Sequence, residues 1–181
     1  IQLKNVQLWS AEQPNLYTVR VVQKDENGKE EMAFSTKYGF RDIEIKNSLV
    51  YINGQRVFFK GVNRHEHSGA TGQYVSRKTM EQDVQIMLEN NINTVRTCHY
   101  PDDTYWYELC DKYGIYVIDE ANNESHPQGY GANSLAKKEE WKEPFLYRCR
   151  NMLERDKNHP SIIVWSVGNE CGNGVCTKAC Y

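Results

Sequence analysis

The sequence has no long apolar run and no surplus of charge of one sign. Its 181 residues include 22 Lys and Arg against 24 Asp and Glu, so the formal net charge is −2. A nucleic-acid or membrane-surface partner favours a basic stripe, and we therefore expect neither partner. No segment approaches the ~18 apolar residues of a membrane helix, and the mean hydropathy is −0.75. With 12 Tyr, 4 Trp and 5 Phe the chain can still bury a core.

Cysteine gives no recognisable framework of disulfides or zinc ligands. Six cysteines are spread over 181 residues. Cys98, Cys110 and Cys149 fall within a strand and two helices predicted below, where a small buried thiol is ordinary. The three between residues 171 and 180 lack the paired C-x2-C spacing of a zinc site. We interpret all six as structural or incidental.

Residues 1–46 are predicted to be antiparallel β structure. Apolar and polar side chains alternate at period two, and the sequence DENG at residues 25–28 forms a turn. A further strand pair follows and ends in the Asn53-Gly54 turn. The expected strands cover residues 16–22, 31–40, 43–45 and 49–52.

From residue 57 onward strands and helices alternate, which is the pattern of βαβ units. The expected strands cover residues 57–62, 94–97, 115–118 and 161–165. The apolar faces of the three intervening helices are Met80, Val84, Met87 and Leu88; Tyr105, Trp106, Leu109, Cys110 and Tyr113; and Trp141, Phe145, Cys149, Met152 and Leu153. Ser76 or Thr79 caps the first helix, Pro101 opens the second, and Gly114 ends it. The fourth strand is apolar throughout, as a buried parallel strand is.

Two parallel architectures fit this alternation. A doubly wound Rossmann sheet requires a glycine-rich first turn, but the first strand runs into residues 63–67 (NRHEH) with no G-x-G-x-x-G. A (β/α)8 TIM barrel takes about 250 residues, and the predicted strands make up half of one. A four-stranded open sheet would leave an apolar edge strand bare, which favours aggregation. The sequence therefore predicts α/β structure in the form of a truncated (β/α)8 barrel, strands one to four.

Polar side chains gather where a barrel has its active site, at the carboxyl ends of the strands. Four of the five histidines follow predicted strand ends: His65 and His67 after strand one, His99 after strand two and His126 after strand three. The carboxylates in the same positions are Glu66, Asp119, Glu120, Glu124 and Glu170. His159 precedes Pro160 at the opposite end, and we expect it to be structural.

Two chemistries suit such a site. The His65-Glu66-His67 pattern after the first strand could hold a metal that activates water, as in amidohydrolase-type barrels. Alternatively, Glu170 behind Asn169 is a general acid that protonates a glycosidic oxygen while a second carboxylate attacks or activates water. These residues alone leave the two interpretations open.

Six blocks of sequence resemble the β-galactosidases of glycoside hydrolase family two. They occur in the family's order and spacing from about residue 8 to the end of the chain. The blocks are LWSAEQPNLY (8–17), GFR (39–41), GVNRHEH (61–67), RTCHYP (96–101), DEANNESH (119–126) and WSVGNE (165–170). The resemblance implies that residues 1–46 are the C-terminal strands of an immunoglobulin-like β-sandwich. It implies that residues 47–181 are the N-terminal half of a TIM-barrel catalytic domain.

The resemblance also implies roles for individual residues. Glu170 matches the acid/base catalyst, and Asn169 matches the residue that contacts the sugar 2-hydroxyl. The implied ligands of an active-site Mg²⁺ are Glu124, His126 and Glu170. His65 and His99 match histidines that line the galactose subsite, while Arg96 and Asp119 match supporting positions expected to orient the carboxylates. We expect His67 and Glu66 to be structural.

The chain also departs from the family's pattern. Cys98 stands where the motif usually has Ser, Ser125 where Thr is common, and Pro127 where Gly usually follows the histidine ligand. The segment CGNG at residues 171–174 replaces a more usual Ser-Gly-His-Gly. The family's nucleophile, a Glu on barrel strand seven, is not among the predicted strands.

The expected activity of the intact parent, a candidate homo-oligomer, is retaining hydrolysis of terminal, non-reducing β-D-galactosides such as lactose. The 181-residue chain alone is expected to be inactive because the nucleophile is absent. The alternatives are another family-two glycosidase (β-glucuronidase or β-mannosidase), a metal-dependent amidohydrolase-like barrel with zinc at His65 and His67, and a non-catalytic complementation fragment.

Overall fold

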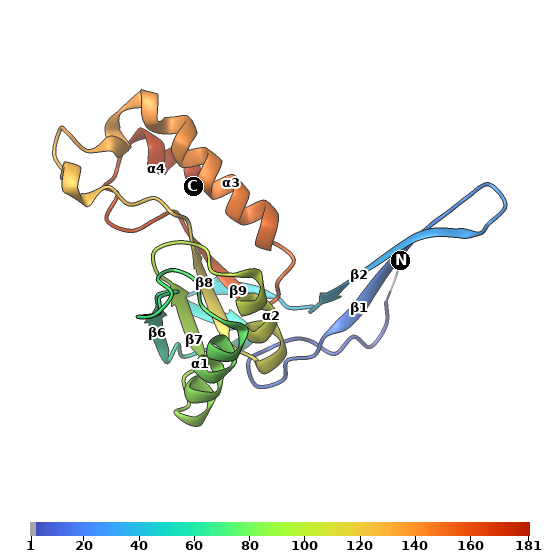
Figure 1. Cartoon of the computed structure of the whole chain (residues 1–181). Coiled ribbons are helices and arrows are strands. Elements are labelled where there is room, and N and C mark those ends of the chain that lie inside the picture. Colours follow the sequence, from blue (N-terminus) through green and yellow to red (C-terminus); the bar gives the residue numbers. More distant parts are fainter. Residues whose placement is uncertain (1–2) are drawn as a thin grey trace.

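The computed structural model describes residues 3–181 and contains three sheets (Figure 1). The first two residues of the predicted antiparallel module lie outside the described residues. Strands β1 and β2 form an antiparallel hairpin that projects from the rest of the molecule, and β3 to β5 form a small antiparallel sheet. Strands β6 to β9 form a parallel sheet in chain order. The bounds are β1 Tyr17–Lys24, β2 Glu30–Tyr38, β3 Ile43–Lys46, β4 Leu49–Ile52, β5 Gln55–Arg56, β6 Gly61–Arg64, β7 Thr94–Thr97, β8 Tyr116–Glu120 and β9 Ile162–Ser166.

Helices connect the parallel strands, as predicted for the first half of a barrel. The bounds are α1 Arg77–Glu89, α2 Thr104–Tyr113, α3 Lys142–Asp156 and α4 Val175–Cys180. The Ser76 hydroxyl accepts a hydrogen bond from the Thr79 amide and caps α1, as expected. Helix α2 begins three residues later than predicted, because the Asp103 carboxylate, not Pro101, provides its cap. Gly114 ends α2 in the left-handed conformation, at φ 77°.

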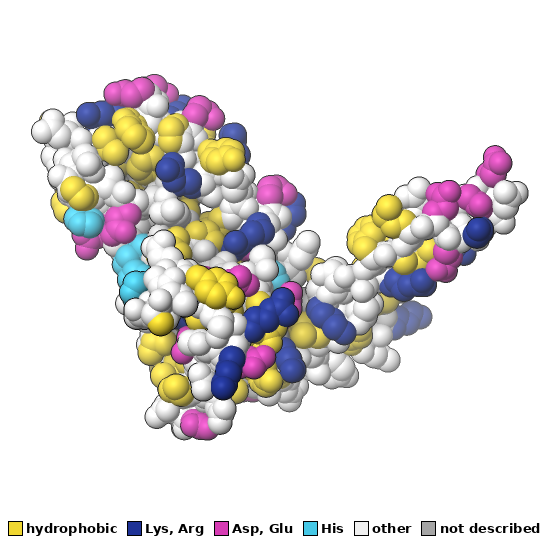
Figure 2. Space-filling model, viewed as in Figure 1, with side chains coloured by type: hydrophobic (Ala, Val, Ile, Leu, Met, Phe, Trp, Pro, Cys, Tyr) yellow, Lys and Arg dark blue, Asp and Glu magenta, His cyan; other side chains and the backbone are white. Residues whose placement is uncertain are grey.

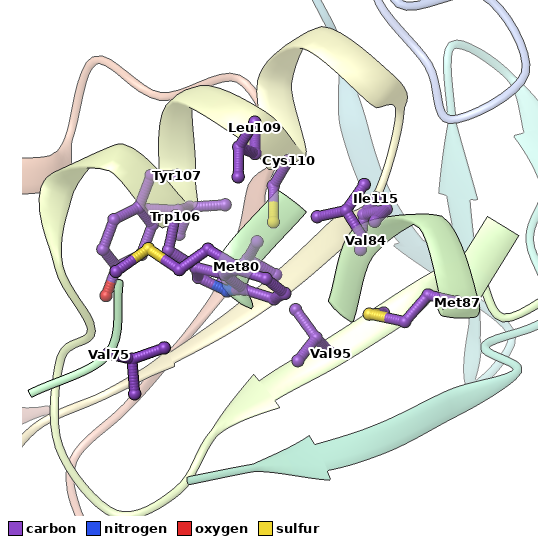
Figure 3. Close-up of a cluster of buried hydrophobic side chains, with 12 residues drawn as sticks. Val75, Met80, Val84, Met87, Val95, Trp106, Tyr107, Leu109, Cys110 and Ile115 are labelled. Atoms are coloured by element: carbon purple, nitrogen blue, oxygen red, sulfur yellow. The ribbon is translucent and has the colours of Figure 1, made fainter. Parts of the chain in front are cut away.

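The main core lies between the parallel sheet and helices α1 and α2 (Figure 3). Its members are Val75, Met80, Val84, Met87, Val95, Trp106, Tyr107, Leu109, Cys110, Ile115, Val117 and Ile162. Leu88 and Tyr113 were predicted to face inward but are 42% and 40% exposed. Each lies at the edge of the apolar face of its helix. The part of that face that is buried is therefore narrower than the sequence pattern predicts. The same holds on α3, where Leu153 is exposed, and just before it, where Trp141 is exposed.

A second core joins the N-terminal segment to the parallel sheet. Trp9 is wholly buried against Ile52, Tyr116 and Ile163, and its indole nitrogen donates to the Asp111 carbonyl oxygen at 2.9 Å. This core explains why β8 is buried at the end of the sheet opposite the predicted site.

Two strand predictions need correction. The first barrel strand begins at Gly61 instead of Val57, and Phe58 is 65% exposed. The fourth strand was expected to be buried along its length, but Val164 and Trp165 are 38% and 37% exposed. Within residues 3–181, β9 pairs only with β8, so one edge of β9 stays uncovered. The division at residues 46/47 stays a prediction, and β3 and β4 pair across it. None of the helices in residues 3–181 is long and apolar enough to cross a membrane.

Candidate active site

The predicted site residues lie in the loops at the carboxyl ends of the parallel strands. Figure 2 shows histidine side chains, with acidic ones beside them, where the part that carries the sheet meets the part that carries α3 and α4. The loops after β8 and β9 are held together through their backbones. The Asn169 amide donates to the Asn123 carbonyl oxygen at 3.0 Å. Gly168 has φ 145°, and a Cβ there would lie 2.3 Å from the same oxygen. Glycine is therefore required for this close approach.

The Asn169 side chain links two other predicted residues. Its Nδ2 donates to Glu124 Oε1 at 2.9 Å, and its Oδ1 accepts from Arg96 Nη2 at 2.9 Å. Because the arginine can only donate and the carboxylate can only accept, the orientation of the amide is fixed. The structure thus brings Arg96, Glu124 and Asn169 together.

Glu170 follows with an exposed side chain and an unusual backbone conformation. Its φ is 43°, a left-handed conformation that is uncommon for a residue other than glycine. His126 Nδ1 lies 3.8 Å from Glu170 Oε2 and 3.4 Å from Glu124 Oε1. The Tyr130 hydroxyl donates to Glu170 Oε2 at 2.9 Å, and this hydrogen bond raises the pKa of Tyr130. Tyr130 lies in a loop without periodicity, so the sequence pattern gives no signal for it.

Glu120 is the carboxylate at the centre of the site, although it was not assigned a role from the sequence. Its side chain is fully buried, and both of its oxygens are used. Oε1 contacts Arg96 Nη2 at 3.0 Å and His99 Nδ1 at 2.8 Å. Oε2 accepts from Arg96 Nε at 2.8 Å and from the Ser166 hydroxyl at 2.7 Å. Glu120 therefore holds residues from β7, the loop after β7, and β9.

Asp119 lies on the opposite face of β8, because successive side chains of a strand alternate between faces. It accepts hydrogen bonds from the Tyr107 hydroxyl at 2.7 Å and the Thr97 hydroxyl at 3.3 Å. Burial raises the pKa of Asp119 to about 7. Its nearest link to the site is Thr97, whose hydroxyl also accepts from the Glu120 amide at 3.0 Å. The expected supporting role of Asp119 stays a prediction, and the direct support of Arg96 comes from Glu120.

His65 and His99 face each other across the mouth of the sheet. Their rings meet edge to face with centroids 5.2 Å apart. With Tyr100 and Glu124 they line a hollow of about 790 Å³, within the ~300–1,000 Å³ range of small-molecule sites. His99 is oriented by Glu120, since the carboxylate accepts from Nδ1 and leaves Nε2 facing away. His159 lies at the other end of the sheet, 2.6 Å from Asp111.

Comparison with known families agrees with this arrangement. The profile of glycosyl hydrolases family 2, TIM barrel domain, matches residues 43–181, and that of glycosyl hydrolases family 2 matches residues 1–41. The chain belongs to glycosyl hydrolases family 2. This membership replaces the amidohydrolase-like interpretation of His65 and His67.

Two relatives within the family are β-galactosidases. The enzyme of Priestia megaterium is 50% identical over 179 residues, which are 95% of this chain and 17% of the relative. That of Alteromonas mediterranea is 43% identical over 181 residues, which are 100% of this chain and 17% of the relative. The chain thus spans about 17% of the length of these curated relatives.

A solved structure shares the fold. It is the β-glucuronidase of Bifidobacterium dentium, with a TM-score of 0.85 and 30% sequence identity. The alignment covers 99% of this chain and 29% of that chain. The four parallel strands therefore correspond to the start of the family-2 barrel.

The magnesium ligands implied for this family can be compared with the donors present. Glu124 and Glu170 supply oxygen ligands, which suit Mg²⁺, and His126 lies between them. The donor types therefore fit the cation. Among residues 3–181, however, the group of three potential metal ligands whose atoms all lie within 4.8 Å of one another is a different one. It consists of His65, Cys98 and His99.

Proposed function

We propose that this chain supplies the acid/base half of a retaining β-galactosidase that hydrolyses terminal, non-reducing β-D-galactosides such as lactose. The observation that carries the proposal is the position of Glu170. It follows Asn169 after the fourth parallel strand, is 54% exposed, and adjoins residues that contact the histidine-lined hollow. The two β-galactosidase relatives, at 50% and 43% identity, support the galactoside over the glucuronide.

In this proposal Glu170 acts twice. Its carboxyl group protonates the departing glycosidic oxygen while a second carboxylate attacks the anomeric carbon. The resulting Glu170 carboxylate then takes a proton from the water that releases the sugar. Retention requires the two carboxyl groups to lie ~5–5.5 Å apart across the barrel mouth. The family resemblance places the nucleophile on barrel strand seven, so we infer that the chain needs strands five to eight from outside itself.

The remaining residues position the sugar and the acid. His65 and His99 line the hollow in which we place the galactose, and Glu120 fixes the ring of His99. Asn169 is held between Arg96 and Glu124, and we propose that it contacts the sugar 2-hydroxyl. Because Glu120 and Arg96 lie on strands β8 and β7, Glu170 is next to residues whose positions are fixed by the sheet.

We also propose Mg²⁺ at Glu124, His126 and Glu170. When bound, the cation supplies positive charge beside the acid. We also propose that the parent is a homo-oligomer, which light scattering of the full-length protein would test.

The experiment compares leaving groups in the completed barrel, meaning this chain joined to or mixed with a chain that carries strands five to eight. For Glu170→Gln we expect kcat/KM for an alkyl β-galactoside to fall at least ~100-fold. The loss should be far smaller for a dinitrophenyl β-galactoside, whose leaving group needs no proton. Equal losses on both substrates would show that Glu170 is not the acid.

Two controls test whether the chain is inactive alone and whether the substrate is a galactoside. Turnover by the 181-residue chain alone, above that of its own Glu170→Gln variant, would contradict the half-site. A nitrophenyl β-glucuronide hydrolysed faster than the matching β-galactoside would favour the glucuronidase alternative.

A further inference from the structure

Two histidines that line the hollow, His65 and His99, form a group of metal-ligating side chains with the buried Cys98, and the proposed hydrolysis does not use these three together. Ligand atoms of His65, Cys98 and His99 all lie within 4.8 Å of one another. One thiol and two imidazoles are the donors that zinc takes in proteins. We propose that these three residues bind Zn²⁺, or a similar thiophilic divalent cation, with the fourth position open to the hollow.

The orientation of His99 supports a metal site. Its Nδ1 is engaged by the buried Glu120 carboxylate at 2.8 Å, so its Nε2 carries the free lone pair. Metal-bound histidines almost always donate their other nitrogen to a carboxylate, a carbonyl or water in this way. Glu120 is itself held by Arg96 and Ser166, which keeps the ring in place.

The other two proposed ligands differ in burial: Cys98 is buried and His65 is exposed. Cys98 is 2% exposed, and its amide donates to the Arg64 carbonyl oxygen at 3.0 Å, which ties it to the end of β6. His65 is exposed, so its ring can turn toward the other two ligands. Tetrahedral zinc, with bonds of ~2.0–2.3 Å, needs its ligands roughly 3.5 Å apart, which requires a movement of about 1 Å.

Binding of the cation changes no oxidation state and needs no oxidant or reductant. The Cys98 thiolate and two neutral imidazoles donate lone pairs to the cation, and the thiol proton passes to solvent. Burial raises the pKa of Cys98, so the thiol stays protonated until a cation arrives. The family's motif usually has Ser at the position of Cys98, so the thiol is a departure of this chain from that motif.

The consequence for catalysis rests on the proposed function, whereas the metal site does not. His65 and His99 line the hollow in which we place the galactose. Bound zinc would occupy these two side chains and exclude the sugar. Zn²⁺ should therefore act as a competitive inhibitor of galactoside hydrolysis.

Binding is measured first, on the reduced, chelator-treated 181-residue chain titrated with Co²⁺. We expect one equivalent to bind with a thiolate-to-metal charge-transfer band and tetrahedral d–d absorption, and Zn²⁺ to displace it. Cys98→Ser should abolish the charge-transfer band. Both Cys98→Ser and His65→Gln should weaken Zn²⁺ binding at least ~10-fold in competition with a chromogenic chelator.

Cys180→Ser is the matched control, because Cys180 lies on α4 outside the group. It should leave the band unchanged, and circular dichroism checks that each variant is folded. A band that survives Cys98→Ser, or is lost in Cys180→Ser, would overturn the site. Zinc affinity unchanged in the exposed His65→Gln variant would overturn it as well.

Inhibition is measured second, in the completed barrel. Zn²⁺ should raise KM for a nitrophenyl β-galactoside without lowering kcat. Cys98→Ser should shift the inhibition constant at least ~10-fold while the uninhibited rate is unchanged. If Zn²⁺ binds as described but no galactoside is hydrolysed, the proposed function fails and the metal site stands.

Discussion

Arg64 and Arg96 lie near the carboxyl ends of the neighbouring strands β6 and β7. Both bind carboxylates, but Arg64 contacts three of them and Arg96 contacts one. Arg64 is 8% exposed and contacts Asp102 at 2.7 Å, Glu66 at 3.2 Å and Asp83 at 3.0 Å. Three carboxylates thus share one guanidinium. Asp83 lies on α1 and Asp102 lies just before α2, so this cluster joins both helices to the sheet.

Arg96 serves a single buried carboxylate and points onward to the site. Glu120 accepts two of its hydrogen bonds, and Asn169 accepts a third. Both oxygens of Glu120 are paired. Within residues 3–181, by contrast, Nη2 of Arg64 and Oδ1 of Asp102 are buried without a hydrogen-bond partner.

The difference separates stability from function. The Arg64 cluster ends within the fold, while the Arg96 cluster ends at the loop that carries Glu170. We therefore expect substitutions of Arg64 to change mainly the free energy of unfolding. Substitutions of Arg96 should change mainly the rate of hydrolysis.

The largest effect is expected for Arg64→Met. This change keeps the stem of the side chain but leaves the buried Glu66 carboxylate without a cation and Asp102 without its hydrogen-bond donor. Removing one partner of a buried ion pair costs about 3–5 kcal/mol. Urea unfolding of the chain measures this loss, with Arg77→Met, an exposed arginine on α1, as the matched control. The control should cost less than ~1 kcal/mol. Equal losses in the two variants would contradict the structural role of Arg64.

The next effect is expected for Arg96→Lys, which keeps the charge but loses the planar fork. A lysine cannot bind both oxygens of Glu120 and also Asn169, so Asn169 and the adjoining acid lose their frame. We expect kcat in the completed barrel to fall about 100-fold, with KM changed much less. Arg64→Lys is the matched comparison and should lower stability while leaving kcat unchanged. The reverse pattern would show that the roles of the two arginines are exchanged.

The sequence predicts the fold where hydrophobic periodicity reports burial directly. β7 occupies residues 94–97 as expected, and Val95, its apolar residue, is fully buried. The pattern fails for Phe58 and Trp165, which are apolar but exposed. Phe58 lies in the segment between β5 and β6, and Trp165 lies on β9, which has one uncovered edge.

The site divides in the same way. Motif residues in loops, such as Glu124, His126 and Glu170, were predicted from the sequence because their identities carry the signal, and they lie close together in the structure. Glu120 was counted among the carboxylates at the strand ends but was given no role. The third strand was predicted to stop at residue 118, whereas β8 continues to Glu120. Beyond a strand end, two adjacent acids are equivalent. Inside a strand they face opposite sides, and this choice assigns Glu120 to the site and Asp119 to the helices.

The smallest expected effect is on the pH dependence of the free energy of unfolding, through Asp102 in the Arg64 cluster. Burial raises the pKa of Asp102 to about 8. Arg64 lowers the pKa, and the neighbouring Glu66 carboxylate raises it. The unfolded pKa is near 3.8. Between these values the folded chain holds a proton that the unfolded chain has released. The free energy of unfolding therefore falls as pH rises through this window, by at most about 1.4 kcal/mol per pH unit, and levels off above the folded pKa.

Asp102→Asn should remove this contribution. Urea unfolding between pH 6 and pH 9 would then show a flatter dependence in the variant than in the unchanged chain. Asp119, whose pKa burial raises to about 7, acts in the same direction in both proteins. Because Asp119 raises the pKa of Asp102, the difference between the two curves reports Asp102 together with its interaction with Asp119. Parallel curves would mean that Asp102 is ionised throughout and that Arg64 balances the cluster fully. The contrast with the fully paired Glu120 would then disappear, and the two arginine clusters would differ only in where they lead.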